Sequence, residues 1–543
     1  MSRFDIRKRD GLARTGSFQT GDVTISLPSA QETEVLFPDL TTMRFGTMPV
    51  SAPIALVKDF PVDPELRPII IHPHLPPTAV SGDCVMVADW HTAFANPRSY
   101  VGWLVGLKEK TAPDTLWYAP GSALPSNVHI LCYSGFDLFD FVAVDLKSSQ
   151  EKFCTPEGEL AADAMKGGIC SCAGCKAGDL REHNRNALLR EIALVARYIT
   201  MGRLRELVES RCRMDAPQVA IMRHLDNRYA FMEQRLPVGR AGVMLATSGE
   251  SMQRAEIKRF TERLLTRYIP PKTDVAVLLP CSARKPYSLS QSHKKFQMAV
   301  AGRAHELIVT SPIGLVPREL ETIYPAMHYD VPVTGYWDAE ECAVISDVLA
   351  RYFAKFKYRR IIAHLEGGAL TVARQAAERC GITLECSCGE NPTSSAALNT
   401  LDAMLAGERR IRDDRVHGMA SWQFGCDLDT KGFVFRGHFP EVFYSRNNLQ
   451  LFSIDTATGL LRPTIDGWAL IPEGYRVEID DFIPEGDILS PGVMKADPQI
   501  RDGDEVLVVG ARARAVGRAA LSGEEMAQMK RGVAVRVRKI KRL

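Results

Sequence analysis

The chain has 543 residues, 45% of them hydrophobic and 24% charged, with a formal net charge of +2. This composition is typical of a soluble globular protein, and the length predicts about three to five domains. The near-neutral charge excludes a polycation, so a nucleic acid would have to bind local basic patches. No run approaches the ~20 apolar residues of a membrane span. The 13 cysteines are mostly scattered singly, which predicts a reducing cytoplasm as the location.

The first ~180 residues read as mixed strands and loops, in keeping with the usual length of one domain. Short apolar runs predict strands at 68–72, 85–89 and 128–132. Apolar residues recur at helical spacing from Leu188 to Glu209, which predicts one long helix there.

From Asp274 onward strands and helices alternate. Strands are expected at 275–279, 306–310 and 360–365, helices at 292–301, 340–356 and 369–380, and a loop at 311–318. This order predicts a parallel sheet with right-handed crossovers. The carboxyl ends of its strands would bring their loops into one crevice.

Residues ~390–460 predict a smaller α+β unit, near the lower size limit of a domain, with a helix at 396–406. Beyond Leu461, short strands separated by Gly and Asp turns are typical of a small β-barrel. Its strands are expected at 467–471, 475–479, 504–509 and 532–537.

The densest chemistry lies in residues 280–296, between a predicted strand and a predicted helix. A thiolate at Cys281 could add to an electrophilic carbon, and His293 could carry protons. Lys285 or Arg284 could hold a phosphate or carboxylate. The competing interpretation is a loop whose hydroxyls only cap the next helix, a role that Ser292 would suit.

A second cluster has metal-ligand spacing. Cys170, Cys172 and Cys175 offer three thiolates within six residues, and His183 could complete a tetrahedral zinc site. The neighbouring pair Cys386 and Cys388 is a weaker pattern, for which we expect no metal.

Several other polar residues are candidates for binding a substrate. Asp89 and Asp140 are carboxylates at or after strand ends, although such residues are more often turn or cap residues. Glu366 and Gly367 open a helix after a strand, where a ligand can approach the backbone. Asp338 follows two aromatic residues that could stack on a base. Ser311 ends another strand of the predicted sheet.

The last 14 residues carry seven basic side chains and no acid, interleaved with apolar ones. This alternation predicts a final barrel strand with one phosphate-facing side. The candidate RNA contacts are Lys530, Arg536, Arg538, Lys539 and Lys541.

Three stretches resemble known families. The C-terminal ~80 residues, near the usual lower size for a domain, resemble a PUA domain, an RNA-binding barrel, through motifs such as Ile500-Arg-Asp-Gly-Asp-Glu-Val506. The N-terminal part resembles a shortened archaeal tRNA-guanine transglycosylase, through Gly135-Phe-Asp-Leu-Phe-Asp140, the cysteine cluster and Glu182-His-Asn184. In that family the cysteines and histidine bind zinc, Asp140 matches the nucleophile, and Asp89 matches a base-contacting aspartate. The family's Gly-rich loop before the Asp140 motif is missing here.

The middle region separates the possible relatives. Its pattern Pro-Cys-Ser-x-x-Lys-Pro-Tyr-x-x-Ser-x-Ser-His, from Pro280 to His293, is similar to the signature of the archaeosine synthase family. That resemblance implies a uracil-DNA-glycosylase-like α/β sandwich and a tRNA substrate carrying 7-cyano-7-deazaguanine at position 15. It also implies transfer of an amine to the nitrile, with free lysine as the expected donor. Ammonia or glutamine is the alternative donor.

The resemblance implies roles for the candidate residues. The expected catalytic set is Cys281, Ser282, Lys285, Ser290 and His293, with Cys281 forming a transient thioimide. The expected substrate contacts are Asp89, Asp140, Ser311, Asp338, Glu366 and Gly367. Zinc would be structural, and a radical-SAM partner enzyme and a homo-oligomer are further expectations.

The predicted organisation is therefore multidomain α/β. It consists of a shortened transglycosylase-like (β/α) barrel fragment (1–245), an α/β catalytic core (246–392), a small α+β domain (393–460) and a PUA barrel (461–543). The alternative functions are a transglycosylase that inserts the 7-cyano base through Asp140, and a non-catalytic tRNA-binding module.

Overall fold

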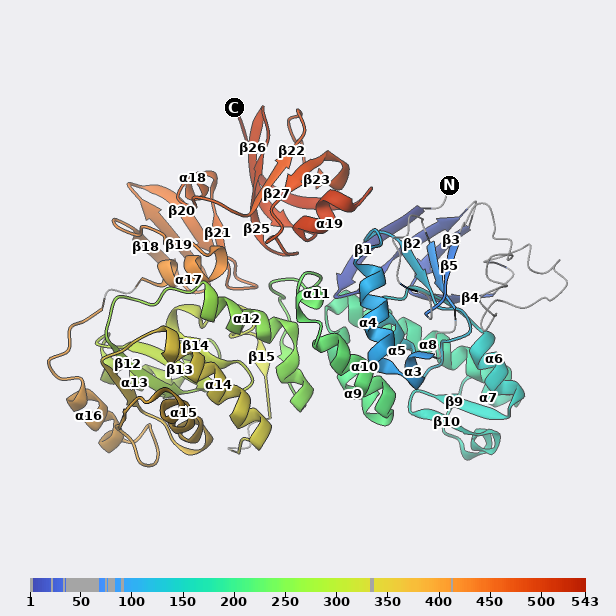
Figure 1. The fold of residues 1–543 in the computed structure, drawn as a ribbon, viewed down its shortest axis with the longest axis horizontal. Helices are drawn as coiled ribbons and strands as arrows, with labels where there is room; N and C mark the ends of the chain where they lie inside the picture. Colours follow the sequence, from blue (N-terminus) through green and yellow to red (C-terminus); the bar gives the residue numbers. More distant parts are fainter. Residues whose placement is uncertain are drawn as a thin grey trace. The chain divides into compact units, whose positions relative to one another are not determined.

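The computed structural model describes residues 3–20, 23–32, 35, 68–73, 76, 84–88, 92–332, 336–411 and 414–543. The chain divides into two compact units (Figure 1). The first comprises Met1–Pro237 with Ile488–Met494 and Leu521–Ala534. The second comprises Val238–Asp487, Lys495–Ala520 and Val535–Leu543.

Two sheets form the core of the first unit. Strands β1 (Arg3–Asp10), β2 (Ala13–Thr20) and β3 (Val23–Leu27) make an antiparallel sheet. A parallel sheet has the order β4-β8-β7-β6-β5. Its strands are β4 (Ser29–Gln31), β8 (Leu138–Asp140), β7 (Leu116–Tyr118), β6 (Cys84–Val87) and β5 (Pro68–Ile71). The two sheets share one apolar core, in which Phe18, Met86 and Leu138 are buried.

Helices surround these sheets. They are α3 (Thr92–Ala95), α4 (Pro97–Lys108), α5 (Val128–Tyr133), α6 (Val142–Ser149), α7 (Ala173–Ala177), α8 (Leu180–Met201), α9 (Leu204–Arg211), α10 (Ala216–Asp226) and α11 (Tyr229–Glu233). A hairpin of β9 (Lys152–Thr155) and β10 (Gly158–Ala161) lies between α6 and α7 in the chain.

Two sequence predictions in this unit are wrong. Residues 128–133 form a helix rather than a strand, and all six are buried. A short, fully buried apolar run has the same pattern in either structure, so periodicity could not separate them. The predicted helix 188–209 is two helices, because Gly202 adopts a left-handed conformation with φ +67° and ends α8.

The second unit contains the predicted sheet, in the order β14-β13-β12-β16-β17. The strands are β12 (Val275–Pro280), β13 (His305–Thr310), β14 (Gly314–Pro317), β16 (Arg360–Ala363) and β17 (Leu384–Cys386). Strands β12, β13 and β16 are parallel, as predicted, and the unpredicted β17 extends the sheet in the same direction. The loop expected at 311–318 instead contains β14, which turns back to pair antiparallel with β13.

The helices of this region are α12 (Ala255–Thr266), α13 (Gln291–Val300), α14 (Ala339–Lys355), α15 (Gly367–Cys380) and α16 (Ser395–Met404). Helix α13 packs against α16, and α14 against α15 (Figure 1). The strand–helix order therefore follows the prediction to within a few residues at each boundary.

A four-stranded antiparallel sheet follows, with β18 (Val434–His438), β19 (Glu441–Arg446), β20 (Leu449–Ile454) and β21 (Leu461–Pro463), preceded by α17 (Arg415–Phe424). The C-terminal sheet has the order β23-β27-β26-β25-β22-β24. Its strands are β22 (Arg476–Ile479), β23 (Ile488–Leu489), β24 (Val493–Ala496), β25 (Glu505–Val509), β26 (Ala513–Ala519) and β27 (Val533–Arg542), with α19 (Gly523–Gln528) before β27.

The strand predicted at 467–471 is wrong. The short helix α18 (Ile465–Trp468) occupies the start of this segment, and the Thr464 side chain caps it by accepting from Gly467 N. A threonine whose side chain accepts from the backbone N–H three residues later caps a helical turn, and this contact favours a helix over a strand.

Candidate functional site

The polar loop begins where β12 ends. Cys281 and Arg284 are exposed, whereas Tyr287 and His293 are fully buried. The loop therefore presents a solvent-facing thiol above a packed base of aromatic and imidazole side chains. This arrangement lies at the carboxyl edge of the parallel sheet, where open α/β sheets bind ligands.

His293 holds the loop onto the sheet. Its Nε2 lies 3.0 Å from the carbonyl oxygen of Pro280, and its Nδ1 lies 2.8 Å from Arg318 Nη2. Arg318 always donates, so Nδ1 accepts and Nε2–H donates to Pro280. Burial, and then the Arg318 charge, lower the pKa of His293 to about 3. Both ring nitrogens are occupied, and this geometry suits an orienting role better than proton transfer.

Arg318 is itself held by two carboxylates. Its Nε donates to Glu306 at 2.9 Å and its Nη1 to Glu321 at 2.8 Å. The same oxygen of Glu321, Oε2, also accepts from the backbone N–H of Ser288 at 2.9 Å. A chain of charge-assisted hydrogen bonds thus runs from β13 through Arg318 to both ends of the polar loop.

Lys285 lies beside Cys281 and over an aromatic ring. Its Nζ is 3.9 Å from the centroid of the Tyr329 ring. Burial lowers the pKa of Lys285, and the nearby Cys281 and Asp330 partly offset this effect. Tyr329 Oη in turn contacts Tyr287 Oη at 2.8 Å and Thr310 Oγ1 at 2.5 Å. The loops after β12 and β13 are joined by this hydroxyl network.

The hydroxyls of the loop have mainly local partners. Ser290, not Ser292, caps α13, because its Oγ accepts from His293 N at 3.2 Å. Ser282 Oγ donates to the carbonyl oxygen of Arg284 at 2.9 Å. The capping interpretation of this loop is therefore right for Ser290, while Cys281 and Lys285 play no capping part.

The loop after β16 lies on the same edge of the sheet. Glu366 is exposed, and its Oε2 accepts from Asn391 N at 2.9 Å. Gly367, with φ +54°, has open space around its Cα, whereas a Cβ on Gly368 would lie 3.3 Å from the Trp337 ring. His364 packs edge-on against Phe296 of α13 at 5.2 Å between centroids, which links this loop to the polar one.

Ser311 and Asp338 have different surroundings. Ser311 is buried, and its carbonyl oxygen accepts from Thr310 Oγ1 at 3.2 Å. Asp338 caps α14 by accepting from Glu341 N at 2.8 Å, in a reciprocal capping box. One carboxylate oxygen of Asp338 is thereby committed to the helix.

Asp140 belongs to the first unit and is completely buried at the end of β8. It accepts from Tyr118 Oη at 2.6 Å, Gly121 N at 2.9 Å and Val142 N at 3.0 Å. Burial raises the pKa of Asp140, and these three donors oppose the rise. The other predicted carboxylate of this region, Asp89, lies outside the described residues.

The cysteine cluster converges with His183 as predicted. The ligand atoms of Cys170, Cys172, Cys175 and His183 all lie within 4.8 Å of one another. The Nδ1 of His183 is 3.2 Å from Cys175 Sγ and 3.5 Å from Cys172 Sγ. This set could hold a metal ion, and three sulfurs with one imidazole are a donor set that suits zinc.

The surroundings support that fit. His183 Nε2 donates to the carbonyl oxygen of Cys154 at 3.1 Å, which leaves Nδ1 to face the sulfurs. Phe153 stacks on the ring, with centroids 3.7 Å apart. A Cβ on Gly174 would lie only 2.3 Å from His183 N, so only glycine allows α7 and α8 to approach this closely.

The predicted RNA contacts divide into two groups. Lys530, Arg536, Lys539 and Lys541 are exposed. Lys541 lies opposite Arg514 in the β26–β27 ladder, and Arg536 lies opposite Arg518. Like charges directly across a ladder repel, so these pairs favour an anionic partner.

Arg538 belongs to a cluster that the sequence analysis missed. It donates to the buried Glu505 at 3.1 Å, and its closest ion-pair distance to that carboxylate is 2.8 Å. Arg518 pairs with Asp455 at 2.7 Å and with Glu505 at 3.6 Å, and Arg462 lies 3.8 Å from Asp455. About a third of each arginine side chain is exposed (31–33%). Two buried acids thus hold three arginines with donors facing solvent.

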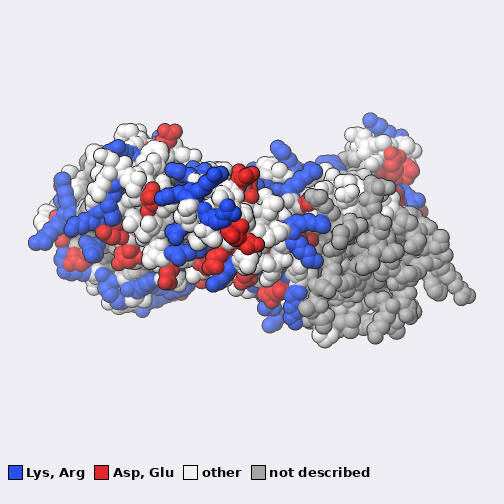
Figure 2. Space-filling model, turned by 90° about the horizontal axis from the view of Figure 1, so that it is seen from above, with Lys and Arg blue, Asp and Glu red and all other residues white. Residues whose placement is uncertain are grey.

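The described part of one face is mixed in charge. Figure 2 shows Lys and Arg side chains interspersed with Asp and Glu there. A face of this kind presents no single basic field.

Sequence reasoning missed Arg318, Tyr329 and the arginine cluster for a common reason. Their partners are distant in the chain: Arg318 meets His293, and Arg518 meets Asp455. The position of Arg318 directly after an apolar strand was the only local signal.

In the described part of the chain, no helix is long and apolar enough to cross a membrane.

Comparison with known proteins gives two family matches. Residues 257–405 match a family described as a domain of unknown function (DUF5591), and residues 475–541 match the PUA domain. The first match covers the polar loop and the sheet beneath it. The second confirms the PUA resemblance at the C-terminus.

Relatives match much more of the chain. An archaeosine synthase from Haloferax volcanii is 34% identical over 579 aligned positions, covering 99% of each chain. The archaeosine synthase subunit alpha of Methanosarcina acetivorans is 39% identical, over 82% of this chain and 78% of its own. A tRNA-guanine(15) transglycosylase from Methanobrevibacter smithii is 25% identical, over 77% and 66%. The chain therefore belongs to the archaeosine synthase family.

Proposed function

We propose that the protein is an archaeosine synthase that modifies tRNA by adding an amine to the nitrile of 7-cyano-7-deazaguanine. The observation that carries this proposal is the similarity to a protein named archaeosine synthase over 99% of both chains. The PUA match supports tRNA as the substrate. The exposed Cys281 beside Lys285, at the carboxyl edge of the parallel sheet, supplies suitable chemistry.

The proposed reaction starts at Cys281. Its thiolate adds to the nitrile carbon while the nitrile nitrogen takes up a proton, which gives a thioimide. The amine, proposed to be that of free lysine, then attacks the same carbon and displaces the thiolate. The product is an amidine, and the thiol is regenerated.

Lys285 is the proposed proton donor to the nitrile nitrogen. A buried lysine with a lowered pKa gives up its proton more readily near neutral pH than an exposed one. His293, Ser290 and Ser282 would act by fixing the loop, since their polar atoms already have partners within it.

The remaining substrate contacts are proposed from the places of their residues in the fold. Glu366 offers an exposed carboxylate oxygen for the ammonium group of the donor, and Asp338 a second carboxylate. The open backbone at Gly367 and the strand end at Ser311 would contact the base. Asp89 and Asp140 are retained as proposed base contacts of the first unit.

The tRNA backbone would contact the C-terminal basic residues. We include Arg462 and Arg518 with Arg536, Arg538, Lys530, Lys539 and Lys541, because two buried acids hold these arginines in place. Zinc at Cys170, Cys172, Cys175 and His183 would be structural, since four protein ligands leave no open position.

The finer fold assignments also belong to this proposal. They are a transglycosylase-like barrel fragment at 1–245, a uracil-DNA-glycosylase-like core at 246–392, a small domain at 393–460 and the PUA barrel from 461. A radical-SAM partner and a homo-oligomer are proposed on the family resemblance alone.

Mass spectrometry of nucleosides tests the reaction. Transfer RNA bearing the 7-cyano base is incubated with the pure protein and isotopically labelled lysine. We expect the modified nucleoside to gain the mass of one lysine. An unchanged nitrile with both labelled lysine and labelled ammonium would refute amine transfer.

Cysteine variants test the role of Cys281. Cys281→Ala should lower single-turnover amination by at least about 100-fold, the lower range for losing a catalytic group. Cys386→Ala, which removes another exposed thiol of the same unit, should be neutral. Near-normal turnover of Cys281→Ala would remove the thioimide from the mechanism.

The rival function is base exchange through Asp140, which the similarity to a tRNA-guanine(15) transglycosylase favours. It predicts incorporation of labelled guanine into tRNA, lost in Asp140→Asn. The three hydrogen bonds that Asp140 accepts leave its carboxylate poorly placed to act as a nucleophile.

A further inference from the structure

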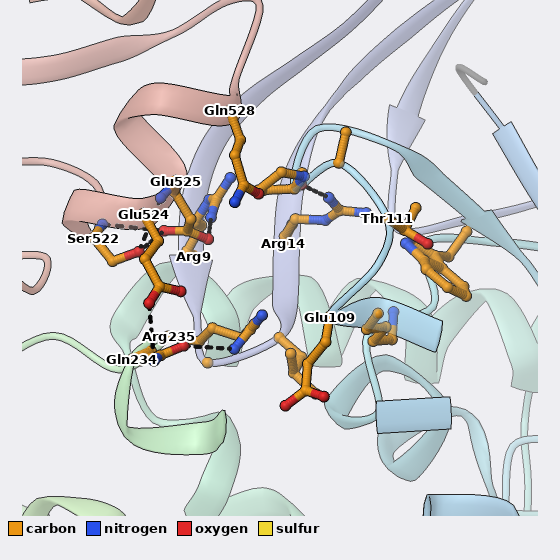
Figure 3. Close-up of a pocket in the computed structure, with 16 residues that line it drawn as sticks. Arg9, Arg14, Glu109, Thr111, Gln234, Arg235, Ser522, Glu524, Glu525 and Gln528 are labelled. Atoms are coloured by element: carbon orange, nitrogen blue, oxygen red, sulfur yellow. Dashed lines mark hydrogen bonds and ion pairs between the residues drawn. The ribbon is translucent and has the colours of Figure 1, made fainter. Parts of the chain in front are cut away.

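A cavity of about 250 Å³ lies in the first unit, and none of the residues assigned above lines it. It is lined by the β1–β2 hairpin, the end of α4 and the segment after it, Trp117 of β7, the two residues after α11, and helix α19 with its capping residue Ser522. Figure 3 shows that Glu109, Arg235 and helix α19, which carries Glu524 and Gln528, contribute side chains to one space. The walls are mainly polar and charged.

Two of the cations that line the cavity belong to its walls. Arg9 pairs with Glu525, which is also held by Ser522 N at 3.1 Å. Arg14 pairs with the buried Asp137 and donates to the carbonyl oxygens of Pro113 and Thr115. These pairs fix the shape of the cavity, and most of their hydrogen-bonding capacity is used.

Arg235 is different. Its Nη1 donates to the carbonyl oxygen of Phe231 at 2.8 Å, and its guanidinium stacks 3.8 Å from the Phe231 ring centroid. Among the described residues, its Nε and Nη2 have no acceptor, and no carboxylate lies within ion-pair distance. Burial lowers the pKa of Arg235, with Glu525 and Glu109 opposing this effect. A half-buried guanidinium with unfilled donors favours an anion in the cavity.

Lys108 adds a further hydrogen-bond donor at the same place, and burial lowers its pKa well below the usual value of a lysine. Its Nζ donates to the carbonyl oxygen of Gly135 at 3.0 Å and lies 3.5 Å from the Trp117 ring centroid. Arg9 Nε is also buried without a partner. The cavity therefore has unfilled donors on two arginine side chains, Arg235 and Arg9.

Two carboxylates of the lining indicate that a ligand here would also carry a cationic group. Glu109 and Glu524 are exposed, and the only partner of either in the described structure is Gln234, 3.4 Å from Glu524. A ligand with both an anionic and a cationic group would satisfy both ends of this lining. A simple anion would face the two carboxylates unpaired, and a simple cation would face the charge of Arg235.

We propose that this cavity binds a free α-amino acid, with the carboxylate at Arg235 and the ammonium group toward Glu109 and Glu524. The volume suits a ligand of that size, well below the 300–1,000 Å³ of a site for a drug-sized molecule. The site is independent of the proposed amine transfer, because it is built entirely from the first unit and needs no tRNA.

Isothermal titration calorimetry on the full chain without tRNA tests the proposal. The probes are L-lysine, L-glutamate and glycine, with acetate, methylamine and inorganic phosphate as single-charge references. We expect saturable heat with at least one amino acid and weaker or no heat with the references. Tighter binding of phosphate or acetate than of every amino acid would overturn the zwitterion assignment.

Variants distinguish amino-acid binding in this cavity from binding elsewhere on the protein. Arg235→Met should weaken amino-acid binding by at least about tenfold, the effect of losing one charge-assisted hydrogen bond. Arg98→Met, an exposed arginine of the same unit, should leave it unchanged. The exposed pair Glu109→Gln and Glu524→Gln should reduce the preference for glycine over acetate without affecting folding. Unchanged amino-acid binding in Arg235→Met and in the glutamate variants would mean that the amino acid binds elsewhere, for example at the proposed active site. That result would refute the assignment of amino-acid binding to this cavity.

Discussion

The sharpest stability prediction concerns Arg318. Its side chain is 8% exposed and links Glu306, Glu321 and His293 behind the polar loop. In Arg318→Met, both carboxylates lose their main ion pair and His293 Nδ1 loses its donor. Breaking a buried pair by removing one partner costs about 3–5 kcal/mol, a large share of the ~5–15 kcal/mol that stabilises a typical domain.

The matched control is Arg351→Met. Arg351 and Asp347 form an exposed pair on α14, 3.8 Å apart, with side chains 60% and 56% exposed. Such pairs contribute about 0–1 kcal/mol, so this variant should be close to the parent protein. Both arginines lie in the second unit, which makes the comparison direct.

Native-state hydrogen exchange is the assay, because a chain with several units need not unfold in one step. We expect the amides of β12 and β13 to lose about 3–5 kcal/mol of protection in Arg318→Met. Amination should fall as well, because Ser288 N and His293 both depend on this network. A loss no larger than that in Arg351→Met would refute the idea that Arg318 organises the loop.

Three further predictions concern other parts of the molecule. Lys539→Ala with Lys541→Ala should reduce the slope of log affinity for tRNA against log salt by about 1.4–1.8, at ~0.7–0.9 per lost phosphate contact, and leave thermal stability unchanged; an unchanged slope would exclude both lysines as RNA contacts. Gly174→Ala should weaken metal retention, measured by atomic absorption after chelator challenge, because its Cβ would lie 2.3 Å from His183 N; full retention would contradict the packing of α7 on α8. If Lys285 must be protonated to donate its proton, single-turnover amination should decline as pH rises through a pKa below the usual 10.5, because burial lowers that pKa. Lys285→Arg should lose most of the amination activity at every pH, since a guanidinium stays charged and does not give up its proton, and a parent-like rate and pH profile in this variant would assign the titration to another group.

The sequence by itself determined the parts of this protein that depend on local pattern. The alternating strands and helices from Val275 to Cys380 follow from short apolar runs between helical periodicities. The metal cluster follows because Cys170, Cys172 and Cys175 are close in the chain and His183 lies on the next helix. The PUA resemblance follows from motifs along the C-terminal strands.

Only the tertiary structure decided the features that depend on distant partners. Packing that an apolar run does not encode decided three features. They are the antiparallel direction of β14, the break of the helix at Gly202 and the helix at 128–133. The Nδ1 of His293 is occupied because it accepts a hydrogen bond from Arg318, 25 residues away. The amino-acid cavity joins residues more than 500 positions apart, such as Arg9 and Glu525. Burial and charge pairing, which set how these groups behave, arise only when the chain brings them together.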